Sequence, residues 1–299
     1  MKPLARILAA TDLSAPAHHA VDRGFRIASE TGAGYSVMYA FELDSVDALG
    51  GLLGEGVAAV KRKLEESARE ALHAMLDDPV RNRGVAAGAM IVAGTPLESI
   101  AERADAIDAD LLVLGARGES FLHHALLGST ASRLLRKSIR RPVLVVKQPP
   151  RGPYHRLLIP VDFSRSSEGA ICLGRRVAPE AEIVLLHAFE LPFEGKLAFA
   201  GVDENVIHEY IRVAREERRR RLHDLARLAG LDLMQYSAIV RHGDPSQQII
   251  SEEQESDCDL IVMGKHGTHV TEELLLGSVT KHVLYESQCD VMVFSETAR

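Results

Sequence analysis

Two stretches of the sequence place three glycines and a serine at the same spacing. In each stretch a short apolar run is followed by Gly, two residues, Gly, nine residues and then Gly-Ser. The first set is Gly115, Gly118, Gly128 and Ser129, and the second is Gly264, Gly267, Gly277 and Ser278. Each member of the second set follows its counterpart by 149 positions, so one loop is present twice.

A loop of this composition can hold an anion through main-chain amides. Glycine at the end of a buried strand lets a ligand approach the backbone, and a second glycine suits a turn with positive φ that directs N–H groups to one point. The Gly-Ser pair opens a helix, whose free N–H groups and dipole attract negative charge. The pattern predicts a nucleotide-phosphate site in at least one copy. The alternative is an ordinary turn followed by an ordinary helix N-cap.

The two loops belong to two copies of a domain-sized repeat. The segment ARILAATDLS at 5–14 matches HRLLIPVDFS at 155–164, and AGTPLESI at 93–100 matches HGDPSQQI at 242–249. A period near 150 residues indicates two domains. We predict domains at residues 1–147 and 155–299. The linker between them, 148–154, is rich in proline and is therefore short and stiff enough to favour a packed pair.

Within each repeat, apolar runs of strand length alternate with amphipathic helical runs. The expected strands are 6–10, 35–40, 86–92, 111–114 and 143–146, then 156–161, 182–187, 234–241, 260–263 and 291–294. The expected helices are 16–31, 56–81, 96–107 and 130–139, then 167–178, 204–228, 245–256 and 279–286. This alternation predicts an α/β fold with a doubly wound parallel sheet of five strands in each repeat.

Ligands of such sheets lie beyond the carboxyl ends of the strands, where the strand order reverses. Asp12 ends the first strand of repeat one, and Asp162 ends that of repeat two. We therefore expect Asp12 to share a crevice with the Gly115 loop, and Asp162 with the Gly264 loop. Either Asp could hold Mg²⁺ through water, although a nucleotide contact or a strand-end cap is the favoured role.

Composition narrows the classes of partner. The net charge of −7 argues against a general nucleic-acid or membrane-surface binder, which needs a basic field. The sequence contains no apolar run of 18 residues, and the first residues indicate a strand rather than a signal peptide. Cys172, Cys258 and Cys289 have neither metal-site nor disulfide spacing, which fits a reduced cytoplasm and small buried side chains. We expect a cytoplasmic protein.

Signatures of catalysis are missing from the sequence. It contains no Gly-x4-Gly-Lys-Ser/Thr, Gly-x-Ser-x-Gly or His-Glu-x-x-His motif. The nearest cations to the loops, Arg117 and Lys265, are one residue out of register. The histidine pairs 123–124 and 266 with 269 have no Cys or carboxylate at ligand spacing, so we expect no metal site. The run 218–221, four arginines, is interpreted as a solvated helix face. We predict no catalytic residue, and at most slow hydrolysis of ATP.

At these residues the chain resembles the universal stress protein family in its tandem two-domain form. The Gly-x2-Gly-x9-Gly-Ser/Thr loop is the signature of the ATP-binding branch of that family, and it is complete in both halves. The Asp after the first strand and the small residue after the second strand also match, and the resemblance covers about residues 5–147 and 155–295. It implies flavodoxin-like domains that bind ATP or ADP. It further implies that the last strands of the two halves pair within one chain as a pseudo-dimer.

The resemblance also implies a set of site residues. The adenine would lie near Asp12 and Ala40, or near Asp162 and Ala188. The phosphates would contact the three glycines and the serine of one loop, with Thr130 beside the first copy: Gly115, Gly118, Gly128 and Ser129, or Gly264, Gly267, Gly277 and Ser278. Repeat two departs from the family at Asp290, where repeat one has Pro142 before the last strand. The loop between the second and third glycines also differs, since FLHHALL in repeat one is more apolar than THVTEELLL in repeat two, so the two pockets need not bind equally well.

Three functions remain open at this point. The first is a nucleotide-binding stress or signalling protein whose occupancy changes its choice of unidentified protein partners, as an intrachain pseudo-dimer or a further homodimer. The second is an adaptor whose loops are empty. The third is an adenylating enzyme, which would need acid or base residues that the sequence does not identify.

Overall fold

The fold comes from a computed structural model that describes residues 3–41, 57–118, 127–136, 141–191, 200, 202–267 and 276–295. The chain divides into two compact units: residues up to Pro153 form the first, with which Met292–Ser295 are grouped, and Tyr154–Val291 form the second. Within the described residues, no helix has both the length and the apolar character needed to span a membrane.

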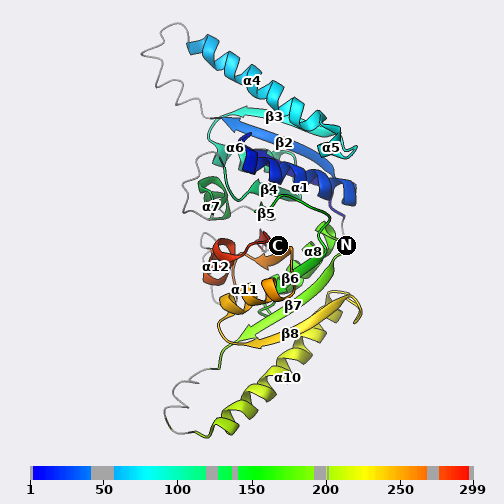
Figure 1. The fold of residues 1–299 in the computed structure, drawn as a ribbon, viewed down its shortest axis with the longest axis vertical. Helices are drawn as coiled ribbons and strands as arrows, with labels where there is room; N and C mark the ends of the chain where they lie inside the picture. Colours follow the sequence, from blue (N-terminus) through cyan, green and yellow to red (C-terminus); the bar gives the residue numbers. More distant parts are fainter. Residues whose placement is uncertain are drawn as a thin grey trace. The chain divides into compact units, whose positions relative to one another are not determined.

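The first unit alternates strands and helices along the chain (Figure 1). Its strands are β1 (Arg6–Thr11), β2 (Gly34–Phe41), β3 (Ala87–Ala93), β4 (Leu111–Gly115) and β5 (Val143–Val146). Its helices are α1 (Ala15–Thr31), α4 (Val57–Asp77), α5 (Pro79–Asn82), α6 (Pro96–Ala106) and α7 (Ser129–Arg136). The strand order is β3-β2-β1-β4-β5, and all four neighbouring pairs are parallel.

The second unit repeats this arrangement. Its strands are β6 (Arg156–Pro160), β7 (Glu182–Phe189), β8 (Tyr236–His242), β9 (Leu260–Gly264) and β10 (Asp290–Phe294). Its helices are α8 (Arg165–Val177), α10 (Glu204–Leu228), α11 (Pro245–Glu255) and α12 (Ser278–Glu286). The strand order is β10-β9-β6-β7-β8, and β6 is parallel to both β7 and β9, as β7 is to β8.

Helices cover both faces of each sheet, as the sequence predicted. In the first unit α5 contacts both α1 and α4, and α6 contacts α7. In the second unit α8 contacts α10, and α11 contacts α12. The central strands are therefore buried on both sides: every residue of Leu111–Leu114 and of Leu260–Met263 is buried. The fold is a tandem pair of doubly wound α/β domains.

One predicted helix is two helices in the structure. The stretch expected as one helix over 56–81 ends as α4 at Asp77, and Gly56 lies outside the described residues. Asp78 then accepts a hydrogen bond from the Val80 amide at 2.9 Å and caps α5, which begins at Pro79. The expectation was wrong because Pro79 has no N–H and suits a first helical turn better than a helix interior.

The cysteines are packed rather than reactive. Cys258 is 7% exposed, and burial raises the pKa of its thiol to about 12. Burial also raises the pKa of the half-buried Cys172 thiol, and Cys289 is buried. Because the thiolate is the reactive form, the raised pKa values keep the thiols of Cys258 and Cys172 protonated near neutral pH in the folded chain.

We predict that iodoacetamide at pH 8 leaves Cys258 unmodified in the folded chain. The same reagent should modify all three cysteines in 8 M urea, where burial no longer raises the pKa. Peptide mass mapping after a timed quench measures both rates. Equal rates for Cys258 in the folded and unfolded chain would contradict the prediction.

Candidate functional site

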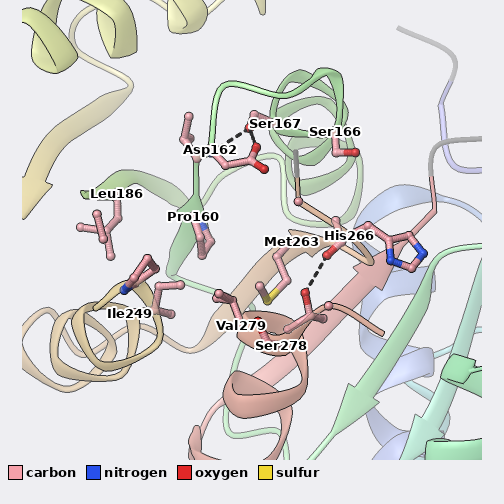
Figure 2. Close-up of a pocket in the computed structure, with 17 residues that line it drawn as sticks. Pro160, Asp162, Ser166, Ser167, Leu186, Ile249, Met263, His266, Ser278 and Val279 are labelled. Carbon is pink, nitrogen blue, oxygen red and sulfur yellow. Dashed lines mark hydrogen bonds between the residues drawn. The ribbon is translucent and has the colours of Figure 1, made fainter. Parts of the chain in front are cut away.

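Each unit has a cavity beyond the carboxyl ends of its strands. The cavity of the second unit has a volume of about 320 Å³ and lies at the ends of β6, β7 and β9, between α8 on one face and α11 and α12 on the other (Figure 2). The cavity of the first unit occupies the same place and has a volume of about 120 Å³. Each cavity lies where the strand order of its unit reverses: the first between β1 and β4, and the second between β6 and β9.

The structure brings nearly all the expected site residues to these cavities. The second cavity is lined by Asp162, Ala188, Gly264, Gly267, Gly277 and Ser278. The first is lined by Asp12, Ala40, Gly115, Gly118, Gly128 and Thr130. Ser129 begins α7, is exposed and is not among the residues that line the first cavity.

The second glycine of each loop is required for a reason other than the expected one. Neither Gly118 nor Gly267 has a positive φ, so the expectation of a left-handed turn there was wrong. A Cβ on Gly118 would instead lie 2.4 Å from Oδ2 of Asp12, and one on Gly267 would lie 3.1 Å from Oδ2 of Asp162. A Cβ at Gly118 would therefore force the Asp12 carboxylate to shift, and one at Gly267 would crowd the Asp162 carboxylate more mildly.

The third glycine closes the loop onto the strand end. The Gly128 amide donates to the Ala116 carbonyl at 2.7 Å, and the Gly277 amide donates to the Lys265 carbonyl at 3.0 Å. These two amides are therefore already used and are not free for a phosphate, contrary to the simplest interpretation of the motif. The free amides are those of the following helical turn, because the first N–H groups of a helix have no intrahelical partner.

Asp12 and Asp162 shape the turns that follow the first strand of each unit. Oδ1 of Asp12 accepts hydrogen bonds from the Ser14 amide at 3.0 Å and the Ser14 hydroxyl at 2.5 Å. Oδ1 of Asp162 accepts the same pair from Ser164. The residues between, Leu13 and Phe163, have φ of 62° and 61°, a conformation that is rare for bulky side chains. One carboxylate oxygen thus caps the turn, and the other lies beside the glycine loop.

Sequence reasoning missed the apolar and hydroxyl parts of the lining. In the second unit these residues come from β6, β7, β9, α8 and the first turns of α11 and α12: Pro160, Ser166, Ser167, Leu186, Pro245, Ile249, Met263, Val279 and Thr280. Their counterparts Pro96 and Ile100 line the first cavity. The repeated Gly-x-Pro segments carried the missing signal. Gly94 and Gly243 have φ of 149° and 131°, and each precedes a helix that begins with proline at the cavity.

The cations near the loops are placed differently in the two units. Arg117 lines the first cavity, and its counterpart at the 149-residue offset is His266 rather than Lys265. Lys265 is buried. Figure 2 shows the His266 ring pointing away from Asp162 and Ser278. Among the described residues, no group of three or more His, Cys, Asp or Glu side chains is arranged for a metal ion. The histidines at 123, 124 and 269 lie outside the described residues.

Three of the four arginines at 218–221 are exposed, as the sequence suggested, but Arg218 and Arg221 also lie over aromatic rings. The guanidinium of Arg218 lies 4.3 Å from the ring centre of Phe189, and that of Arg221 lies 4.0 Å from the ring centre of Phe163. These are cation–π distances. The aromatic partners lie 26 residues apart on β7 and after β6, so the helical pattern alone could not indicate the contacts.

His187 lies within this aromatic cluster. Its Nδ1 is 2.7 Å from the Val161 carbonyl, and its ring centre is 4.4 Å from that of Phe163. Burial lowers the pKa of His187, and the charges of Arg218 and Arg221 lower it further, against the Val161 hydrogen bond and Asp162, which raise it. The unfolded chain therefore binds a proton here more readily than the folded chain does.

We predict that His187 makes the second unit less stable as the pH falls. A lowered folded pKa leaves stability intact above the ordinary histidine pKa, about 6.5, and removes it progressively below that value. His187→Gln should flatten the decline in the free energy of unfolding between pH 7.5 and pH 5.5. Urea unfolding at several pH values measures the slope, with exposed His208→Gln as the control. An unchanged slope in His187→Gln would refute the prediction.

Comparisons with known proteins agree with this architecture. The model of the universal stress protein family matches residues 4–147 and again residues 153–295. A universal stress protein of Methanocaldococcus jannaschii is 34% identical over 145 residues, which cover 48% of this chain and 82% of that protein. One from Mycobacterium tuberculosis is 26% identical over 221 residues, or 68% of this chain and 67% of that protein.

A solved structure supports the fold along nearly the whole chain. The crystal structure of a universal stress protein from Archaeoglobus fulgidus has a TM-score of 0.62 and 20% identity, and it covers 97% of this chain and 98% of its own. The double family match, the parallel sheet in each unit and the repeated loop lead to one conclusion. The chain belongs to the universal stress protein family and carries two domains of that family in tandem.

Proposed function

We propose that the chain binds an adenine nucleotide, ATP or ADP, and serves as a nucleotide-binding protein of stress response or signalling. The observation that carries the proposal is the convergence of the glycine loop, Asp162 and the N-terminus of α12 on one cavity of the second unit. Its volume of about 320 Å³ falls at the lower end of the range of about 300–1,000 Å³ that is typical of small-molecule sites.

The lining suits the two ends of a nucleotide. Leu186, Ala188 and Ile249 give one part of the cavity apolar walls, which suit a planar base. The N-terminus of the nine-residue helix α12 and the amides of its first turn give the other part a positive potential, which suits phosphates. Asp162 also lines this cavity, and its carboxylate is the group that would meet a ribose hydroxyl or, through water, Mg²⁺.

The geometry favours binding over turnover. Oδ1 of Asp162 already accepts hydrogen bonds from the amide and hydroxyl of Ser164. A carboxylate so engaged is a weak candidate for a general base, which must be free to take a proton. We propose that the nucleotide acts as a ligand whose presence alters the surface seen by protein partners.

An adaptor role without nucleotide is favoured by one separate feature. Val206, Tyr210 and Val213 recur at helical spacing along α10 and are 60%, 54% and 48% exposed. An apolar stripe of this kind suits contact with another protein.

Equilibrium titration distinguishes the two functions. We expect ATP and ADP to bind the purified chain in calorimetry and inorganic triphosphate to bind much more weakly, because the base contributes through apolar contacts. The variant carrying both Gly128→Val and Gly277→Val should lose this binding, because a Cβ at those positions meets backbone atoms at 3.3 Å and 3.2 Å. A wild-type chain that carries no extractable nucleotide and ignores added ATP would favour the adaptor.

A further inference from the structure

The two cavities share one design but differ in size. The second has a volume of about 320 Å³ and the first about 120 Å³. Ligand sites for small organic molecules usually start at about 300 Å³. The first cavity is therefore too small for a nucleotide without rearrangement, and the second is not.

The glycine loop lies closer to the Asp in the first unit. A Cβ on Gly118 would come within 2.4 Å of the Asp12 carboxylate, while one on Gly267 would stay 3.1 Å from that of Asp162. The carboxylate and loop thus approach each other more closely around the smaller cavity. A ligand that enters between them would have to separate them.

A second serine hydroxyl holds the carboxylate in the second unit, in addition to the Ser164 contacts that Ser14 provides in the first. Ser167 is 3% exposed and lines the cavity; its hydroxyl donates to Oδ1 of Asp162 at 2.9 Å and accepts from the Asp162 amide at 3.2 Å (Figure 2). The counterpart of Ser167 at the 150-residue offset is Ala17, which lines the first cavity and has no hydroxyl. Asp162 is therefore held in place before a ligand arrives, which lowers the entropic cost of binding.

A threonine holds the phosphate end of the second site. Thr280 is 3% exposed and lines the cavity, and its hydroxyl donates to the Gly264 carbonyl at 3.0 Å. This bond joins the first turn of α12 to the end of β9, so the helix amides keep their direction toward the cavity. The counterpart at the 149-residue offset is Ala131, which cannot make the bond.

Two differences favour the first unit, and both are small. Thr130 supplies a hydroxyl where the second unit has Val279, and Arg117 supplies a cation. Arg117 is exposed, and ion pairs of exposed cations contribute little because water screens them. Neither difference enlarges a cavity that is less than half the size of the other.

We infer that the second unit carries the tighter of the two nucleotide sites, and that Ser167 and Thr280 are positioning residues that set the difference. The inference rests on the proposed function, because it ranks two sites for the same ligand. As the nucleotide concentration rises, the site of the second unit is therefore occupied first, and the site of the first unit is occupied only at higher concentration.

Titration and labelling test the ranking together. Calorimetry of the full chain with ATP should show one tight site and a second phase at least about tenfold weaker. At substoichiometric 8-azido-ATP, photolabelling and peptide mapping should mark peptides of the second unit. Equal labelling of both units, or preferential labelling of the first, would overturn the inference. Absence of any binding would instead overturn the proposed function.

Matched substitutions test the two residues. Ser167→Ala with Thr280→Ala gives the second unit the side chains of the first and should raise the Kd of the tight site about tenfold or more, the effect of losing about one to two hydrogen bonds. The single variant Thr280→Ser keeps the hydroxyl and leaves Ser167 unchanged, so it should retain most of the wild-type affinity. Ser237→Ala, an exposed hydroxyl on β8, is the control and should leave the Kd within about twofold. An unchanged Kd in the double variant, with its unfolding temperature also unchanged, would overturn the role of these residues.

Discussion

Valine in place of Gly264 should lower the affinity of the second unit for ATP by about 100-fold, which corresponds to about 2.7 kcal/mol of binding free energy. A Cβ at this position would lie 2.9 Å from Cβ of Ser166 and 3.3 Å from the His266 carbonyl oxygen. Real Cβ atoms do not approach another carbon so closely, so the end of β9 and the start of α8 must separate. Both segments line the cavity, and the two γ-methyl groups of valine would add bulk beside it.

The control for this variant is Gly34→Ala. Gly34 begins β2, and its added Cβ would meet only the Ala5 carbonyl oxygen at 3.5 Å, an ordinary contact. Calorimetry with ATP and thermal unfolding without ligand should be run on both variants. Overpacking alone costs about 1–3 kcal/mol of stability, so Gly264→Val should still fold. If the folded variant binds ATP as tightly as the wild-type chain does, the glycine loop of the second unit is not the nucleotide site.

The sequence was sufficient for the fold because its signals are local and repeated. A fully apolar strand such as Leu111–Leu114 is buried on both faces of a sheet, so helices must cover both faces. Strands that alternate with helices along the chain then form a parallel sheet. The carboxyl-end rule placed Asp12 and Asp162 beside the loops, and both residues do line the cavities.

The reasons for particular residues could not be predicted, because they depend on contacts between distant segments. The motif indicated Gly118 and Gly267, but the structure assigns their need to the carboxylates of Asp12 and Asp162 rather than to positive φ. The same holds for Arg221, whose aromatic partner Phe163 is 58 residues away in the sequence. Helical spacing describes which residues share a face, and it carries no information on what that face meets.

Asp290 is the departure from the family pattern that the structure explains most fully. It is 1% exposed, and its Oδ2 accepts a hydrogen bond from the Tyr154 hydroxyl at 2.7 Å. Tyr154 is the last residue of the expected linker, and it is buried rather than part of a solvated connection. Asp290, at the start of β10, is thus hydrogen-bonded to Tyr154, a residue that the sequence pattern assigned to the linker.

Removal of the Glu253 carboxylate should destabilise the second unit by about 3 kcal/mol. Glu253 lies on α11 and is 3% exposed, and its Oε1 accepts hydrogen bonds from the amides of Gln288 and Cys289, both at 2.7 Å. These amides precede β10, which begins at Asp290. Glu253→Ala would leave the buried Cys289 amide without an acceptor, and an unsatisfied buried N–H costs about 1–3 kcal/mol. The counterpart in the first unit is Ala104, so the contact belongs to the second unit alone.

Glu253→Gln separates the hydrogen bonds from the negative charge. Glutamine keeps an oxygen at the Oε1 position but puts an NH₂ group at the buried Oε2, which makes no hydrogen bond to the described residues. We expect a loss of about 1 kcal/mol for Glu253→Gln, because the two amides keep their acceptor. Urea unfolding followed by circular dichroism measures both variants, with exposed Glu102→Ala on α6 as the control. Equal losses for Glu253→Ala and Glu253→Gln would show that the charge, rather than the acceptor, stabilises the start of β10. A loss below about 1 kcal/mol for Glu253→Ala would show that water replaces the carboxylate there, and that the start of β10 is held by the strand pairing of the sheet instead.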